Sequence, residues 1–191
     1  MTKEELYDGL SQLDASKKSR EDYAAIVLKD LSLLQELINT VLLIDDTTSC
    51  RAAWVLELVC NDYIYGIIPY LDVFTKNLHK IHLDSAIRPT AKICGFIAEA
   101  YYTKGDSTFK RLLKPEQKER IIETNFDWLI TNNKVATKAH AMQTLFLFGQ
   151  NETWIHTELF QILQRDFQTE SAGYKARAKH ILQKIKKSSK S

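Results

Sequence analysis

Four basic residues open four helix-forming segments of the sequence in a similar way. Each is followed by alanine or proline and, three positions later, by alanine or tryptophan; the four are Arg51, Arg88, Lys138 and Lys175. Their separations of 37, 50 and 37 residues indicate repeated structural units with one insertion. If the units stack in register, the four cations lie along one edge, where they would bind an acidic ligand or a phosphate backbone. The structural alternative is that they form ion pairs and carbonyl contacts between neighbouring units.

The C-terminal segment departs most strongly from average composition. Residues 171–191 contain no acid and seven bases, which are Lys175, Arg177, Lys179, Lys184, Lys186, Lys187 and Lys190. Residues 1–46 contain ten acids and five bases, so the two ends differ in charge although the formal net charge is only +2. We predict that Arg177 and Lys179 contact an acidic protein or a nucleic acid. The alternative is the solvated outer face of a terminal unit, with bases that interact favourably with the helix dipole.

Other residues that could bind metals or catalyse reactions do not form complete sites. His79 and His82 have an i, i+3 spacing that two metal ligands on a helix could use, but only Asp84 follows at a short offset. Asp45 and Asp46 precede a predicted helix, where capping is their expected role. Phosphate-loop, dinucleotide-binding, serine-hydrolase and zinc-protease motifs are absent from the sequence. We therefore predict no catalytic residue, no metal ion and no cofactor, and we favour a protein that is not an enzyme.

Helices are predicted for all the elements that would position these residues. Apolar residues recur with the spacing of one buried helix face; examples are Ile67, Leu71, Phe74 and Leu78, then Val135, Ala139, Met142 and Phe146, and again Tyr174, Ala178, Ile181 and Ile185. Ten helices are predicted, at residues 2–13, 18–29, 31–44, 48–63, 66–82, 85–103, 115–131, 133–149, 152–167 and 172–187. Glycine and proline total only nine residues, which leaves little turn chemistry for strands. The short connections predict antiparallel neighbours, and residues 102–114 predict a surface loop or short helix with a basic edge.

Two of the opening segments resemble the HEAT-type helical repeat. In that family an aspartate precedes the opening base by six residues, as Asp45 precedes Arg51, and Ile87-Arg88-Pro89-Thr90-Ala91 is similar to the family's Val-Arg-Pro-x-Ala opening. Asn132 and Thr169 stand at the corresponding positions before Lys138 and Lys175. The resemblance covers about residues 18–187 and implies an all-α, right-handed superhelix of about ten helices, an armadillo-like solenoid. It implies one domain, 1–191, with units at about 18–45, 48–82, 85–131 and 133–167 and a terminal helix at 172–187.

The chain as a whole also resembles a family of small bacterial HEAT-like proteins that often carry the name adenylosuccinate lyase. The segments that carry this resemblance are Trp54-Val55-Leu56-Glu57, Arg88-Pro89-Thr90-Ala91-Lys92-Ile93-Cys94 and Ala172-Gly173-Tyr174-Lys175-Ala176-Arg177-Ala178. The signature loop of that lyase, Ser-Ser-x-Met-Pro-x-Lys-x-Asn, is absent because neither Met1 nor Met142 is followed by proline. Lyase activity on a purine nucleotide is therefore not expected.

The composition is that of an ordinary globular protein, with 45% hydrophobic and 26% charged residues. Its apolar runs are far shorter than the roughly 20 residues that cross a bilayer, and acids stand where a signal peptide has its apolar region. Cys50, Cys60 and Cys94 lack metal-binding spacing, and Cys60 and Cys94 lie in apolar helical patterns that predict buried free thiols. We predict a cytoplasmic protein without a membrane contact.

These patterns favour a non-catalytic scaffold that binds a protein partner through a curved, partly basic surface. The predicted contacts are Arg51, Arg88, Lys138, Lys175, Arg177 and Lys179. The alternative is a nucleic-acid-binding protein that resembles the HEAT-like DNA alkyl-base glycosylases, which use an aromatic cradle, a catalytic aspartate and a basic concave face. In that case Trp54 near Asp45 or Asp62 would form the cradle. Residues 1–170, however, carry 24 acids and 19 bases, the opposite sign to a duplex-binding groove.

Overall fold

The computed structural model describes residues 2–188, and every regular element in that range is helical. The α-helices are α1 (Lys3–Gln12), α2 (Lys17–Lys29), α3 (Leu34–Val41), α4 (Thr48–Asp62), α5 (Leu71–Asn77), α6 (Asp84–Tyr102), α7 (Thr108–Leu112), α8 (Pro115–Ile130), α9 (Val135–Phe148), α10 (Thr153–Asp166) and α11 (Ala172–Ser188). Three 3₁₀ segments are η1 (Leu31–Leu33), η2 (Ile64–Tyr70) and η3 (Leu78–Lys80). The prediction of an all-α protein is confirmed, and Lys190 lies outside the described residues.

Local sequence signals explain several helix starts. Thr2 forms a capping box with Glu5, in which the Thr2 hydroxyl accepts from the Glu5 amide at 3.1 Å and the Glu5 carboxylate accepts from the Thr2 amide at 2.8 Å. The Ser16 hydroxyl accepts from the Ser19 amide at 3.1 Å and caps α2. Pro115 occupies the first turn of α8, where its missing N–H removes no helical hydrogen bond.

Two predicted segments differ from the observed elements. Residues 102–114 contain the additional helix α7, so the described chain has eleven α-helices where ten were expected. The helix predicted at 66–82 is divided into η2, α5 and η3. Pro69 lies inside η2 and has no N–H to donate, so a continuous α-helix through this segment would lose a hydrogen bond.

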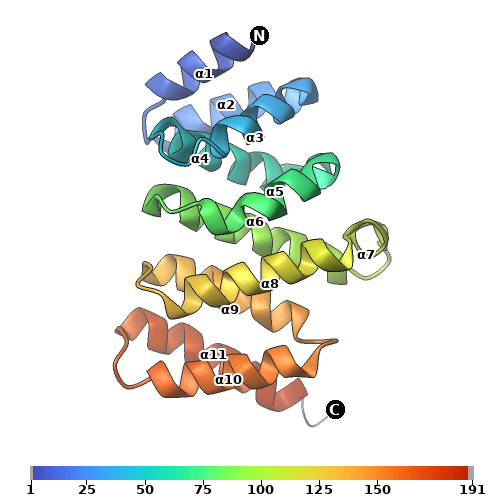
Figure 1. Cartoon of the computed structure of the whole chain (residues 1–191), viewed down its shortest axis with the longest axis vertical. Coiled ribbons are helices and arrows are strands. Elements are labelled where there is room, and N and C mark those ends of the chain that lie inside the picture. The colour runs from blue at the N-terminus through green and yellow to red at the C-terminus, as the bar shows by residue number, and fades with distance from the viewer. Residues whose placement is uncertain (1, 189–191) are drawn as a thin grey trace.

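The helices form two rows that run along a stack (Figure 1). In one row α2, α4, α6, α9 and α11 contact each other in succession, and the other row contains α3, α5, α8 and α10. The second row covers the first through the contacts of α3 with α4, α8 with α9 and α10 with α11. The N- and C-terminal ends of the chain lie at opposite ends of the stack (Figure 1).

A continuous apolar core fills the space between the two rows. Its fully buried side chains include Leu56 of α4, Ile93 of α6 and Leu145 of α9. Alanines such as Ala53 and Ala91 are also fully buried, and their small side chains let neighbouring helices approach closely. Within residues 2–188, none of the helices has the length and apolar character needed to cross a bilayer.

Candidate anion-binding site

Five titratable side chains from four helices of one row form a group that we call the basic cluster. Its members are Glu57 of α4, Arg88 and Lys92 of α6, His140 of α9 and Arg177 of α11. The Glu57 side chain is only 9% exposed and accepts from Lys92 Nζ at 2.8 Å, while Arg88 Nη2 lies 3.4 Å from its other oxygen. Arg88 and Lys92 are one helical turn apart and are 38% and 33% exposed, so both reach solvent beside the buried carboxylate.

His140 lies in the electric field of the three cations of the cluster. Burial, followed by the positive charge of Lys92, lowers the pKa of His140 from 6.5 to about 4, and Arg88 and Arg177 act in the same direction. Glu57 opposes the shift but does not reverse it. The imidazole is therefore neutral at pH 7, because burial first and the neighbouring cations second disfavour its protonated form.

Arg177 contributes a hydrogen-bond donor that the described chain does not use. Its Nε atom is buried and has no hydrogen-bond partner among the described residues. Arg88 and Lys92 pair with Glu57, and Arg177 acts on His140 from α11, so the cluster has three cations and one acid and carries two positive charges in excess at neutral pH. An excess of cations around a partly solvent-exposed surface attracts carboxylates and phosphates, and arginine binds both through charge-assisted hydrogen bonds.

A small pocket adjoins the basic cluster and shares Arg88 with it. Its volume is about 240 Å³, and its lining includes Arg20 of α2, Trp54 of α4 and Lys134. The Arg20 guanidinium lies 5.9 Å from the centre of the Trp54 ring, which is a cation–π distance. Asp84 also lines the pocket, and Lys134 Nζ lies 3.3 Å from its carboxylate.

A proline explains why Trp54 has a defined position in this pocket. Pro89 lies inside α6 and has no N–H to donate to the carbonyl of Ser85, four residues before it. The Trp54 Nε1–H donates instead to that carbonyl at 2.9 Å. The indole is thereby anchored to α6 while its ring remains part of the pocket wall.

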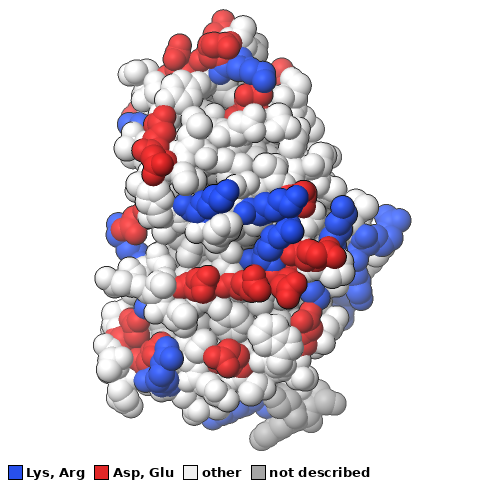
Figure 2. Space-filling view, in the orientation of Figure 1, with Lys and Arg blue, Asp and Glu red and all other residues white. Residues whose placement is uncertain are grey.

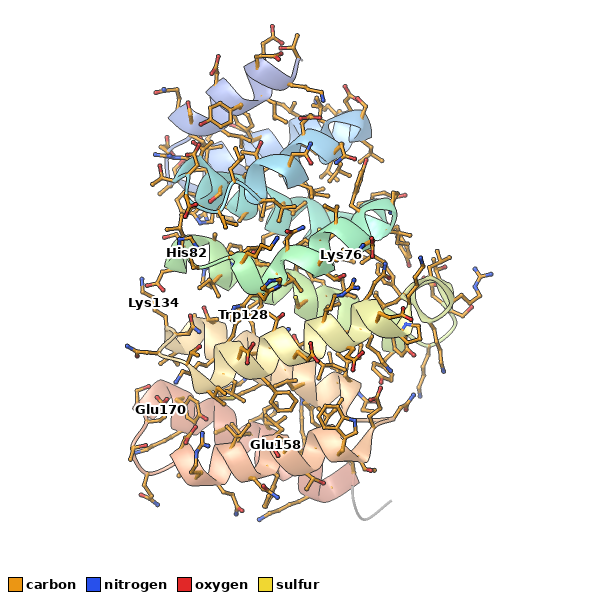
Figure 3. All side chains as sticks on the ribbon, viewed as in Figure 1. Lys76, His82, Trp128, Lys134, Glu158 and Glu170 are labelled. Atoms are coloured by element: carbon orange, nitrogen blue, oxygen red, sulfur yellow. The ribbon has the colours of Figure 1, made fainter. Side chains whose placement is uncertain are left out.

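Ion pairs between successive helices of the α4, α6, α9, α11 row lie along one edge of the stack. His82 Nε2 lies 3.5 Å from Asp45, the Lys134–Asp84 distance is 3.3 Å, and Lys138 Nζ bonds Glu170 at 2.5 Å. Each pair joins the first turn of one helix of the α4, α6, α9, α11 row, or the residues just before it, to the same part of the next helix. The labelled His82, Lys134 and Glu170 can be followed along this edge in Figure 3.

Three of the predicted binding residues form ion pairs or carbonyl contacts within the protein, as the structural alternative to ligand binding predicted. Arg51 Nε donates to the carbonyl of Leu13 at 2.9 Å. Lys138 is 7% exposed, and besides its ion pair its ammonium lies 5.6 Å from the centre of the buried Tyr174 ring. Lys175 Nζ donates to the carbonyl of Gln168 at 3.0 Å. These three cations join segments of the protein to each other.

Of the six predicted binding residues, Arg88 and Arg177 both act electrostatically on His140. Lys179 is exposed on α11 and lines a separate hollow at the end of the stack. Sequence reasoning missed Lys92, although its i+4 spacing from Arg88 places both on one helix face. It also missed Glu57 and His140, for which no local sequence signal exists.

The other candidate residues do not assemble into a further site. Asp45 and Asp62, the acids predicted near Trp54, are not among the residues that line its pocket. Within residues 2–188 there is no group of three or more His, Cys, Asp or Glu residues placed to hold a metal ion. Cys50, Cys60 and Cys94 are all buried free thiols. Burial raises the pKa of the Cys94 thiol to about 12, which keeps it protonated.

The face formed by α3, α5, α8 and α10 has a different charge pattern. Figure 2 shows a row of acidic side chains across α8, whose exposed acids are Glu116, Glu119, Glu123 and Asp127. The helices of the basic cluster belong to the other row, which lies behind this face in Figure 1. Figure 2 also shows lysine and arginine side chains next to this row, so the viewed face carries both signs of charge.

Comparisons with protein-family models, with curated proteins and with solved structures give no match for this chain.

Proposed function

We propose that this protein is a helical-repeat scaffold that binds an acidic segment of a protein partner at the basic cluster. The observation that carries the proposal is the pairing of Arg88 and Lys92 with a single carboxylate, Glu57, beside His140, on which Arg177 also acts electrostatically. The excess positive charge is matched by the carboxylates of an acidic partner.

The scaffold in this proposal is a single-domain, right-handed superhelix of the HEAT type. The successive contacts of α2, α4, α6, α9 and α11 support it, because each helix of a solenoid packs mainly against its neighbours. The edge of ion pairs from Asp45–His82 to Lys138–Glu170 supports it further, since each pair links two consecutive helices of the row near their starts. The buried free thiols support a reducing compartment such as the cytoplasm.

Recognition in this scaffold is a matter of charge complementarity on a rigid surface, without a covalent step. Among the members of the basic cluster there is no serine, threonine or cysteine that could act as a nucleophile. Both carboxylate oxygens of Glu57 are engaged by cations, one by Lys92 and the other by Arg88. The cluster is therefore suited to hold an anion.

A nucleic-acid ligand is the second candidate, and the Trp54 pocket favours it. An indole beside Arg20, Arg88 and Lys134 combines a stacking surface with cations, as single-strand-binding sites do. The acid in this pocket, Asp84, is 54% exposed and paired with Lys134. For Asp84 to take part in base excision, its carboxylate would first have to leave the ion pair with Lys134.

The test compares a double variant of the cluster, Arg88→Glu with Arg177→Glu, with a control double variant, Lys104→Glu with Lys110→Glu. The control removes two exposed lysines from and beside α7, away from the cluster. Each protein is crosslinked in its native cells, and its partners are compared by quantitative mass spectrometry. We expect a partner that is captured by the wild type and the control and lost from the cluster variant. Identical partner sets for all three proteins would contradict the proposal.

A salt titration separates the two candidate ligands. Binding of labelled single-stranded and duplex DNA is measured by fluorescence anisotropy at increasing salt concentration. Under the protein-partner proposal, neither DNA binds appreciably near physiological ionic strength. Tight binding that falls steeply with salt and is abolished by the cluster variant would replace the protein partner with a nucleic acid, because phosphate contacts release counterions.

A further inference from the structure

The C-terminal end of the stack contains a groove between α10 and α11. Both helices contact α9 and each other, and no other described element has comparable contacts with them (Figure 1). Two hollows, with volumes of about 940 and 600 Å³, lie along this helix pair. Gln164 and Lys186 line both hollows, so the two are continuous and form one groove. We call it the terminal groove.

The walls of the terminal groove combine apolar side chains with bases and amides. Phe160 of α10, Phe167 at the C-terminal end of that helix and Leu182 of α11 are half-buried on its surface. Lys179 and Lys186 lie two turns apart on α11, on the same side as Leu182. The remaining polar lining is mostly glutamine, and neither hollow is lined by an aspartate or a glutamate.

This composition differs from that of a solvated end. The last unit of a helical stack needs a polar outer face, because no further unit covers it. Here three large apolar side chains remain between α10 and α11, and the ammonium of Lys186 lies 5.8 Å from the centre of the Phe160 ring. The opposite side of the same helix pair packs against the helix α9. The pair can therefore hold a helix between its two members, and we expect the same kind of element in the groove.

We propose that the terminal groove binds an amphipathic helix of a protein partner, with an apolar face flanked by acidic residues. The apolar face packs on Phe160, Phe167 and Leu182, and the acidic flank pairs with Lys179 and Lys186. Charge complementarity selects the acidic flank, since the groove has lysines and no acid of its own. α10 has 14 residues and is about 21 Å long, which sets the length of the bound helix. This site is separate from the basic cluster and does not depend on its function.

The test uses a designed peptide as the probe. A fluorescein-labelled peptide of the same length as α10 carries leucines at i, i+4, i+7 and i+11 and glutamates beside them, and a matched peptide carries lysines in place of the glutamates. Binding is measured by fluorescence anisotropy with the full chain. We expect the glutamate peptide to bind with a dissociation constant below about 100 μM and the lysine peptide to bind at least about tenfold more weakly.

Three variants locate the binding site. Lys179→Glu with Lys186→Glu is expected to weaken binding of the glutamate peptide at least about tenfold. Phe160→Ala is expected to weaken binding while the circular dichroism spectrum remains helical, which separates loss of the groove from loss of the fold. The cluster variant, Arg88→Glu with Arg177→Glu, is expected to bind the peptide as the wild type does.

Several outcomes would overturn the proposal. They are absence of binding, equal binding of the two peptides, and unchanged binding to the groove variants. Loss of binding in the cluster variant would place the peptide at the basic cluster instead. Displacement of the peptide by single-stranded DNA at physiological salt would assign the groove to a nucleic acid.

Discussion

At the level of single residues, burial and neighbouring cations act together on His140. They lower its pKa to about 4, whereas an exposed histidine has the ordinary value of 6.5. The folded protein therefore holds a neutral imidazole at a pH where the unfolded chain already carries a proton. This difference links the stability of the protein to pH.

The first prediction concerns that linkage. As the pH falls below about 6.5, His140 binds a proton in the unfolded state but stays neutral in the folded state. The stabilising contribution is complete above that pH and is lost as the pH falls towards about 4. In urea unfolding at pH 7.5 and pH 5, His140→Gln is expected to lose less stability on acidification than the wild type. His180→Gln, which replaces an exposed histidine, is the control, and equal losses in all three proteins would contradict the prediction.

Gly149 provides a second test at this scale, because a side chain at this position has no room. A Cβ atom on Gly149 would lie 2.0 Å from Cδ2 of His156. The His156 ring cannot move freely, since its Nε2 lies 2.8 Å from the Phe146 carbonyl oxygen and its ring stacks on Phe146 at 5.2 Å.

The expected effect of Gly149→Ala is a decrease in the free energy of unfolding by about 1–3 kcal/mol, as for other overpacked positions. Gly95→Ala is the matched control. Its Cβ would meet only the Thr144 hydroxyl at an ordinary 3.6 Å. Because Gly95 lies inside α6, alanine is expected to raise stability by roughly 0.5–1 kcal/mol. Urea denaturation measures both changes, and an unaltered midpoint for Gly149→Ala would contradict the packing argument.

At the level of elements, α6 occupies the centre of the stack and contacts α4 on one side and α9 on the other. Its buried residues therefore extend around most of the helix, including the fully buried Ala91. Its narrow exposed side carries Arg88 and Lys92. The helix that supplies most of the cations of the basic cluster is thus also one of the most confined elements of the fold.

The third prediction follows from this confinement. Ala91→Asp places a carboxylate in the interface between helices, where an unpaired charge costs several kcal/mol. The variant is expected to lose its cooperative thermal transition or to melt far below the wild type by circular dichroism. Ala25→Asp, an exposed position on α2, is expected to melt near the wild-type temperature. A wild-type melting temperature for Ala91→Asp would mean that the register of α6 is different.

At the level of the whole molecule, stability depends on contacts between neighbouring helices. α1 contacts α3 and α4, and α11 contacts α9 and α10, whereas α4, α6 and α9 have helices on both sides within their row. A helix at the end of a stack can open without disturbing the centre, because it has neighbours within the stack on one side only.

The fourth prediction is a gradient of hydrogen exchange along the chain. Backbone amides of α4, α6 and α9 are expected to exchange at least about tenfold more slowly than those of α1 and α11. Hydrogen–deuterium exchange with mass spectrometry of the full chain measures this gradient at peptide resolution. Equal protection of all helices would instead indicate that the molecule opens only as one unit.

Most of the secondary structure could be predicted because its signals are local. The residues Tyr174, Ala178, Ile181 and Ile185, which share one predicted helix face, are all buried. Cys60 and Cys94 are buried thiols, as their apolar helical surroundings predicted. The exception is the predicted helix 66–82, where Pro69 favours 3₁₀ geometry over a continuous α-helix. α7 was anticipated only as one of two options for residues 102–114.

The candidate site depended far more on tertiary structure. The four opening bases are equivalent in sequence, yet Lys138 is buried against Glu170, Arg51 and Lys175 bond carbonyl oxygens, and Arg88 reaches solvent. Similar spacing predicted that they share a position in their units, but the partner of each cation comes from another segment.

The amino-acid sequence by itself determined which faces of the helices are apolar, because helical periodicity relates residues only three or four positions apart. Tertiary structure alone decided that Glu57 meets Lys92, which is 35 positions away, and that His140 and Arg177 join them. The physical reason is that such a meeting depends on the rotation and offset between packed helices. Those quantities are set by the fit of many buried side chains at once, and no single segment encodes them.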